Sequence, residues 1–200
     1  MKTFGKILGG LLVVFIILCL VVPQEFRLER EILIDKPLNY TFMKILFLKN
    51  HEQWSHYSLK DPNIQKSYRG QDGTEGYTAS WVSQDEEVGT GEQEIIHIYN
   101  EKIVNTEIRL EKPFKAKFES YFTTAPEGDK QTKVVMGMFS KVAMPMNVFS
   151  YTYNVLLGNQ KKIAANIEES LAQMKSVIEE EKAPATVENH KKEIQPRTRR

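Results

Sequence analysis

Apolar and polar residues follow different patterns in three parts of the chain. Residues 7–22 read ILGGLLVVFIILCLVV, sixteen residues without a charge, and Pro23 follows them. Between residues 25 and 180 apolar and polar positions alternate, whereas residues 181–200 are charged and nearly free of apolar side chains. The pattern predicts a membrane anchor in residues 1–24, one folded domain in residues 25–180 and a disordered charged tail in residues 181–200.

The N-terminal apolar segment has the features of a membrane-spanning helix. Such a helix needs about 20 apolar residues, with about 17 as the lower limit, and Phe4 and Gly5 extend residues 7–22 toward that length. A cleaved secretory signal would begin with the same basic residues, but no small-x-small cleavage site follows here. A lipoprotein signal would need a small residue before Cys19, where Leu18 stands. The sequence therefore favours an uncleaved single-pass anchor over these two alternatives.

The charges beside the apolar segment do not decide its orientation. Lys2 and Lys6 precede it, and Arg27, Arg30 and Lys36 follow it. The very short N-terminal tail favours a cytoplasmic N-terminus. We therefore expect the domain on the outer face of the cytoplasmic membrane.

The folded part begins and ends with elements of different kinds. Alternation predicts strands over residues 26–34, 64–69, 77–83, 88–99, 103–110, 115–124 and 132–140, with a tight turn at residues 100–101. The first strand is interpreted as changing phase at a bulge near Arg30. A helix is expected from residue 35 to Asn50, then a short helix or turn. Helical spacing from Tyr151 to Ile178 predicts a long C-terminal helix, with Gly158 as a break or a close packing point.

This order of elements predicts an α+β architecture. One amphipathic C-terminal helix must bury its apolar face on a sheet, and a strongly twisted seven-stranded antiparallel sheet curves around such a helix. The space between sheet and helix is then a candidate ligand cavity.

Several short segments occur in an order that resembles one protein superfamily. They are Asp35-Lys36-Pro37, Trp54-Ser55 with Tyr57, Asp61-Pro62-Asn63, Trp81 with Glu87-Val88-Gly89-Thr90-Gly91, and Ser170-Leu171-Ala172-Gln173-Met174-Lys175. Together they resemble the helix-grip superfamily of START domains, Bet v 1 and polyketide cyclases, most closely its membrane-anchored bacterial SRPBCC members. His51 and Ser170 depart from the pattern, because tryptophan and glycine are usual there. The resemblance implies a helix-grip fold and a ligand cavity, which some members use for cyclase or aromatase chemistry.

Composition and motifs narrow the function further. The net charge is +1 and no long basic stripe precedes the last dozen residues, which argues against nucleic-acid binding. The single cysteine, Cys19, permits neither an intramolecular disulfide nor a cysteine metal site. The histidines His51, His56, His97 and His190 lack the spacing of a metal site, and no nucleophile elbow or phosphate loop is present. We expect no metal and no cofactor.

The candidate site is the wall of the predicted cavity. Gln93 and His97 are expected to face inward from their strand, and Glu92 and Glu94 to face solvent. The candidate cavity residues are Trp54, Tyr57, Tyr68, Tyr77, Trp81, Gln93, His97, Phe118, Phe122, Met136 and Met138. Aromatic residues at such positions more often pack a core, so this alternative stays open for each of them.

Three functions remain compatible with the sequence. The first is a membrane-tethered domain that holds a small hydrophobic or amphipathic ligand, such as a lipid, between sheet and C-terminal helix. The second is a cyclase- or aromatase-like enzyme in which Gln93 and His97 converge in the cavity. The third is an interaction module without a ligand, in which side chains fill the space. The sequence names neither the ligand nor the oligomeric state, and the volume and lining of the cavity discriminate among these functions.

Overall fold

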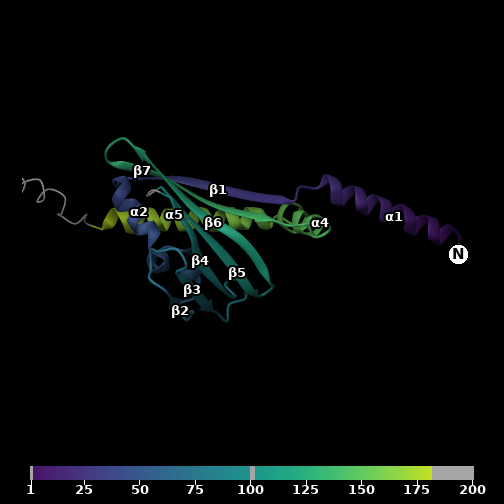
Figure 1. Ribbon diagram of the computed structural model, residues 1–200, viewed down its shortest axis with the longest axis horizontal. Helices are drawn as coiled ribbons and strands as arrows, with labels where there is room; N and C mark the ends of the chain where they lie inside the picture. Colours follow the sequence, from purple (N-terminus) through teal and green to yellow (C-terminus); the bar gives the residue numbers. More distant parts are fainter. Residues whose placement is uncertain (1, 100–101, 182–200) are drawn as a thin grey trace, which may run out of the picture.

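A computed structural model of the protein describes residues 2–99 and 102–181. A long N-terminal helix projects from a domain in which a curved sheet surrounds the C-terminal helix (Figure 1). The elements are α1 (Lys2–Val21), β1 (Glu25–Ile34), α2 (Leu38–Leu46), the 3₁₀-helix η1 (Leu48–Gln53), α3 (His56–Lys60), β2 (Gln65–Arg69), β3 (Thr78–Val82), β4 (Thr90–Tyr99), β5 (Ile103–Lys112), β6 (Ala116–Glu127), β7 (Gln131–Lys141), α4 (Met146–Tyr151), the π-helix η2 (Thr152–Leu156) and α5 (Asn159–Glu180). The expected turn at residues 100–101 and the charged tail beyond residue 181 lie outside the described residues.

The seven strands form one antiparallel sheet in the order β1-β7-β6-β5-β4-β3-β2. Six strands follow one another as a meander, and the first strand returns to pair with the last. The concave face of this sheet encloses α5 (Figure 1). The predicted α+β arrangement, with seven strands around a long C-terminal helix, is confirmed.

The first strand differs from the sequence interpretation, because the bulge expected near Arg30 is absent. The pairing of β1 with β7 runs without a shift from Glu25 opposite Lys141 to Ile34 opposite Thr132. Arg30 therefore occupies an inward register position, and its Nε donates a hydrogen bond of 2.5 Å to Glu168 of α5. A long aliphatic stem lets an arginine at such a position carry its charge back toward solvent.

The C-terminal helix is interrupted at Gly158, one of the two roles predicted for this residue. Gly158 adopts φ 79°, a left-handed conformation that glycine takes at little cost. It separates η2 from α5. As a result, only α5 lies under the sheet, and α4 with η2 forms a separate short helical segment beside the C-terminal end of α1 (Figure 1).

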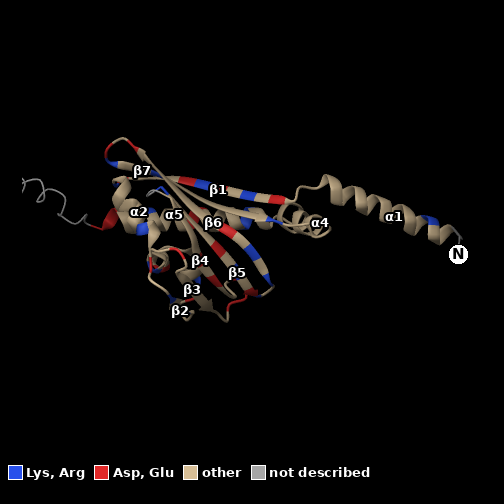
Figure 2. Ribbon diagram, in the orientation of Figure 1, with Lys and Arg blue, Asp and Glu red and all other residues tan. Residues whose placement is uncertain are grey.

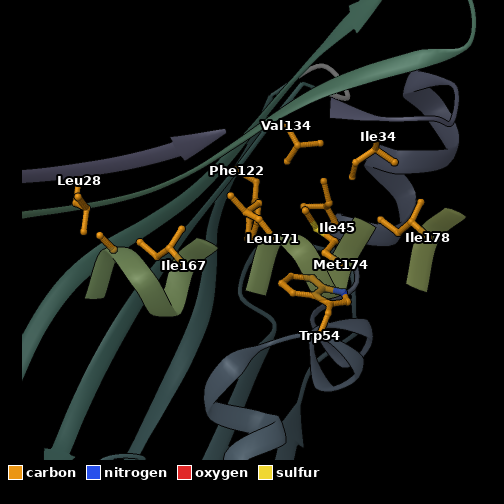
Figure 3. Close-up of a cluster of buried hydrophobic side chains, with 11 residues drawn as sticks. Leu28, Ile34, Ile45, Trp54, Phe122, Val134, Ile167, Leu171, Met174 and Ile178 are labelled. Atoms are coloured by element: carbon orange, nitrogen blue, oxygen red, sulfur yellow. The ribbon is translucent and has the colours of Figure 1, made fainter. Parts of the chain in front are cut away.

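One face of α5 forms the main hydrophobic core. Ile167, Leu171, Met174 and Ile178 recur at helical spacing and are buried against side chains of β1, β6, β7 and α2 (Figure 3). Among the sheet strands, α5 packs most closely on β1, at one edge of the sheet. A second cluster, between α2 and strands β4 and β5, includes Phe42. The core therefore fills only part of the concave face.

Helix α1 is the one described helix long and apolar enough to cross a membrane. Its residues 3–21 have a mean hydropathy of 2.7 and are almost entirely exposed. Such a helix is either a membrane anchor or a signal sequence. Only residues 22–24 separate it from β1. Charges are dense along the sheet, whereas α1 beyond Lys6 and α4 carry none (Figure 2).

We predict that Leu171→Ala lowers the free energy of unfolding by about 2–5 kcal/mol, because it opens a cavity in the main core. Leu33→Ala, at an exposed position of β1, is the matched control and should change it by no more than about 0.5 kcal/mol. Urea titration of the full-length protein in detergent, followed by tryptophan fluorescence, measures both. Equal losses in the two variants would contradict the assigned core.

Candidate functional site

A cavity of about 220 Å³ lies between the concave face of the sheet and α5. Strands β2 to β7 form one wall, α5 forms the opposite wall, and η1 with α3 closes one side. The space exists because α5 packs toward β1, so the part of the sheet formed by β2 to β5 curves away from the helix. Most of the lining is apolar.

Strand pleating decides which side chains reach the cavity. Successive residues of a strand point to opposite faces, so Phe118 and Phe122 of β6 face inward with Met136 and Met138 of β7. The intervening positions form the outer face. There Arg109 lies within 2.7 Å of three carboxylates, those of Glu92, Glu94 and Glu107.

This ion-pair cluster shifts pKa values in the directions that charge predicts. Hydrogen bonds from Lys117 and then Arg109 hold the pKa of Glu107 below its usual value. The three carboxylates raise the pKa of Arg109. The cluster keeps Glu92 and Glu94 on the outer face and away from the cavity, as the alternation predicted.

The structure brings most of the candidate residues to one place. Trp54, Tyr57, Tyr68, Trp81, Gln93, Phe118, Phe122, Met136 and Met138 line the cavity. Tyr77 and His97 do not line the cavity, each for a different physical reason.

Tyr77 precedes β3 and belongs to the second hydrophobic cluster, on α2, β4 and β5. Its ring is stacked on Tyr68, with centroids 6.3 Å apart and planes 8° from parallel. Its hydroxyl has no hydrogen-bond partner within the described part of the chain. Burial, followed by the charges of Asp72 and Glu52, raises the pKa of Tyr77 to about 12. For Tyr77, therefore, the alternative of an aromatic residue that simply packs the core is the correct one.

The inward position expected for His97 is wrong because β4 contains a bulge. Ile95 pairs with Thr106, and His97 pairs with Asn105, the residue beside Thr106 in the antiparallel strand β5. Ile96 is therefore an extra residue. An extra residue reverses the alternation beyond it. His97 therefore faces outward, with its Nδ1 3.8 Å from the carboxylate of Glu75. Gln93 and His97, the pair required by the enzyme hypothesis, lie on opposite faces of the sheet.

Gln93 does line the cavity, at one end of a short polar row. Its amide nitrogen donates to the hydroxyl of Thr106 over 2.9 Å, and that hydroxyl donates to the carbonyl of Ser120 over 3.0 Å. The row satisfies inward-facing polar groups of β4, β5 and β6 internally, as buried polar groups require. Of these three residues Gln93 and Ser120 line the cavity, so the row gives the mostly apolar sheet wall a polar strip.

His51 is a cavity residue that the sequence candidates do not include. It lies in η1, 4.2 Å from the ring of Trp54 and 5.5 Å from the ring of Phe122. Its Nε2 lies 2.7 Å from the carbonyl of Ile45 and must carry the hydrogen, since a carbonyl only accepts. Burial lowers the pKa of His51 to about 4, against smaller raising effects of the Ile45 carbonyl and Asp72. A neutral His51 thus completes an aromatic wall with Trp54 and Phe122.

A charged cluster lies at one rim of the cavity. Lys66 of β2 places its Nζ 3.3 Å from the carboxylate of Glu52 and donates to the hydroxyl of Ser58 over 3.4 Å. The hydroxyl of Tyr68 donates to the same carboxylate of Glu52. Isolated charges on a short strand are typical of a solvated face, so only the tertiary arrangement reveals this cluster.

The sequence places the C-terminal helix across the cavity from the sheet, but the candidate cavity residues include none from α5. Ile163, Asn166, Ile167 and Ser170 line the cavity and recur at helical spacing. Asn166 donates to the hydroxyl of Tyr57 over 3.3 Å, and this bond ties α5 to α3. Ile163 and Ile167 already belong to the apolar stripe that predicts this helix, whereas Asn166 and Ser170 are polar and lie beside it.

Exposed lining residues mark two places where the cavity reaches the surface. Tyr57 and Tyr68 are exposed at the rim near α3 and β2. Lys112 and Pro113 are exposed at the other rim, at the turn between β5 and β6. Among the described residues, no group of three or more histidine, cysteine, aspartate or glutamate side chains is placed to hold a metal ion.

Solved structures with this architecture exist although sequence similarity is low. No family model and no curated protein matches the chain. Norcoclaurine synthase from Thalictrum flavum, in complex with dopamine and hydroxybenzaldehyde, superposes with a TM-score of 0.54 at 13% identity, over 84% of this chain and 94% of the synthase. Ara h 8.0201 gives a TM-score of 0.51 at 12% identity, over 77% of this chain and 97% of the other.

A third similar structure is DynU16, a putative protein from the dynemicin biosynthetic locus. It gives a TM-score of 0.51 at 11% identity and covers 79% of this chain but 48% of DynU16. These neighbours are Bet v 1-like proteins. The chain has the helix-grip fold. In this helix-grip domain, the cavity between sheet and α5 is the candidate binding site.

The buried histidine predicts a pH dependence of stability. Unfolded His51 takes up a proton near pH 6.5, whereas folded His51 does so only near pH 4. Above pH 6.5 both states are neutral and His51 has no effect. As the pH falls from 6.5 to 4 the unfolded state gains a proton first, so stability falls by up to about 3 kcal/mol and then levels off.

His51→Gln removes this titration while keeping an N–H group that can donate to the Ile45 carbonyl. Urea titrations between pH 7 and pH 4 should therefore show a flatter decline for this variant. His97→Gln, at an exposed position, is the control and should decline like the unmodified protein. Identical slopes for all three proteins would show that His51 is not buried in its neutral form.

Proposed function

We propose that the protein is a membrane-tethered binding domain that holds the apolar part of a small hydrophobic or amphipathic molecule between its sheet and α5. The observation that carries this proposal is the cavity of about 220 Å³, walled by aromatic, methionine and aliphatic side chains. Burial of apolar ligand surface in such a site is favourable by about 25 cal/mol per Å².

The cavity volume limits the ligand. An apolar cavity of about 150 Å³ holds benzene, and pockets for drug-sized ligands are roughly 300–1,000 Å³. A volume of about 220 Å³ therefore suits one substituted ring or one short acyl segment. A two-chain phospholipid would have to leave most of its mass outside.

The polar groups suit an amphipathic ligand. The polar strip of Gln93 and Ser120 lies on the sheet wall, and the charges of Glu52 and Lys66 lie at the rim near α3. A ligand with its apolar part inside can place its polar end at that rim, where exposed Tyr57 and Tyr68 also lie. The similar norcoclaurine synthase was solved with two single-ring molecules, dopamine and hydroxybenzaldehyde, which are ligands of the size inferred here.

The other two hypotheses receive less support. Catalysis by Gln93 and His97 requires the two to meet, and the bulge of β4 separates them. An interaction module without a ligand requires a space filled by side chains, whereas a cavity remains. Binding therefore accounts for more of the described site than either alternative.

The membrane tether is the second part of the proposal. Helix α1 has the length and hydropathy of a spanning helix, and no small-x-small site follows it. The end of α1 is also bound by the domain, because the side-chain amide of Asn147 donates to the carbonyls of Cys19 and Val22 over 2.9 Å each. Such contacts favour an uncleaved anchor. We place the domain on the outer face of the cytoplasmic membrane.

Photocrosslinking tests the binding site. Full-length protein in detergent would be irradiated with a diazirine derivative of decanoic acid and of a substituted benzaldehyde, and the labelled peptides identified by mass spectrometry. We predict labelling of the β6 and β7 segments around Phe118 and Met138. We also predict that Ala79→Trp, which fills the cavity, lowers labelling at least about tenfold, equivalent to about 1.4 kcal/mol.

Ala165→Trp is the matched control, because Ala165 is exposed on α5 and does not line the cavity. It should label like the unmodified protein. Absence of cavity labelling with both probes, or equal labelling of the two tryptophan variants, would overturn the proposed binding site.

A further inference from the structure

A second apolar surface lies outside the cavity, in a stretch of chain without charges. Between Lys141 and Lys161, residues 142–160 contain no charged side chain. They include α4 and η2, which together form one continuous helical segment. Sequence spacing alone assigns its residues from Tyr151 onward to the long C-terminal helix, and Gly158 separates them from the core helix α5.

The apolar side chains of this segment face outward together. Met146, Phe149, Tyr153, Leu156 and Leu157 follow helical spacing and are all exposed, Leu156 and Leu157 to 69% and 74%. Phe114, in the turn between β5 and β6, is also exposed and lies beside them, with its ring centroid 6.4 Å from that of Tyr153. We name these six residues the α4 patch. A monomer in water seldom leaves such a surface uncovered.

Contacts with α1 fix the position of the patch relative to the anchor. Asn147 of α4 is buried and holds two carbonyls at the end of α1. The rings of Phe149 and Phe15 have centroids 6.3 Å apart. The segment therefore lies beside the last two turns of α1, within the apolar stretch of that helix.

These contacts set a depth. Residues 3–21 of α1 extend over about 28 Å at 1.5 Å per residue, close to the hydrocarbon thickness of about 30 Å. Phe15 precedes Val21 by six residues, so it would lie about 9 Å below the point where the helix leaves the hydrocarbon. Helices that lie in a membrane interface bury their apolar face by about 5–10 Å. The contact between Phe15 and Phe149 thus brings α4 to the depth of an interfacial helix.

We propose that the α4 patch is a second membrane contact, which lies in the headgroup and acyl boundary of the bilayer that α1 spans. The inference rests on the proposed anchoring by α1. Lys112, Lys115 and Lys161 flank the patch in sequence and can reach the phosphate level with their long side chains. Phe114 directly follows Pro113 of the cavity rim, so this rim opens at the bilayer surface, and an apolar ligand can enter without crossing water.

Site-directed spin labelling tests the depth of the patch. The full-length protein with Cys19→Ala, in vesicles of phosphatidylcholine and phosphatidylglycerol, receives one cysteine at a time: Leu12→Cys in α1, Leu156→Cys in the patch, or Leu33→Cys. Leu33 is the matched control, an exposed leucine about 27 Å along β1 from its anchored end. Power saturation then compares collisions of each label with oxygen, which concentrates in lipid, and with a water-soluble nickel chelate.

The proposal expects the labels at residues 12 and 156 to collide mainly with oxygen, and the label at residue 33 mainly with nickel. Nickel access at residue 156 while residue 12 stays in lipid would overturn the patch contact and leave the anchor intact. Low collision with both reagents at residue 156 would mean that a second copy of the chain covers the patch, which also overturns it. Nickel access at residue 12 would overturn the anchor itself.

Discussion

The burial of one face of α5 against the concave sheet is the constraint on which the rest of the structure depends. A single helix cannot fill the whole concave face of a seven-stranded sheet. Here α5 packs toward β1, where Leu171, Met174 and Ile178 belong to a fully buried core. The preceding turns of the same helix, with Ile163 and Asn166, then face a gap across from β3 and β4. One helix therefore supplies both the stability of the domain and one wall of its cavity.

Because α5 packs on one edge of the sheet only, the two edge strands β1 and β2 have different surroundings. The edge formed by β1 is held by α5 and is joined to α1 through residues 22–24, so it is fixed in place. The opposite edge, β2, carries Lys66 and Tyr68 at a rim that remains open to solvent. The polar strip of Gln93 and Ser120 lies between these edges. Along the sheet, the site thus changes from packed core through apolar cavity to charged rim.

The sequence predicts what local periodicity controls. The strands, α5 and the inward positions of Phe118 and Met138 follow from alternation with a period of two or 3.6 residues. The predicted inward position of His97 is wrong because a bulge depends on how β4 pairs with β5, which no pattern within β4 reveals. His51 and Lys66 are absent from the sequence candidates because they reach the cavity only through the packing of η1 and β2. For Arg30 the error is the reverse, because the sequence predicts a bulge where none exists. A single charged residue in the apolar row suggests a change of phase, but the pairing of β1 with β7 contains no shift.

The three-residue link between α1 and β1 also determines how far the domain can travel. Residues 22–24 extend over about 11 Å at most, and Asn147 of α4 binds the carbonyl of Val22 in this link. With α1 as the anchor, the domain has no reach toward a neighbouring membrane. Under the proposed anchoring by α1, the domain would therefore be unsuited to carrying molecules across an aqueous gap. Exchange of the proposed ligand would then be confined to one leaflet, where lateral diffusion in the plane of the bilayer would bring ligand and protein together.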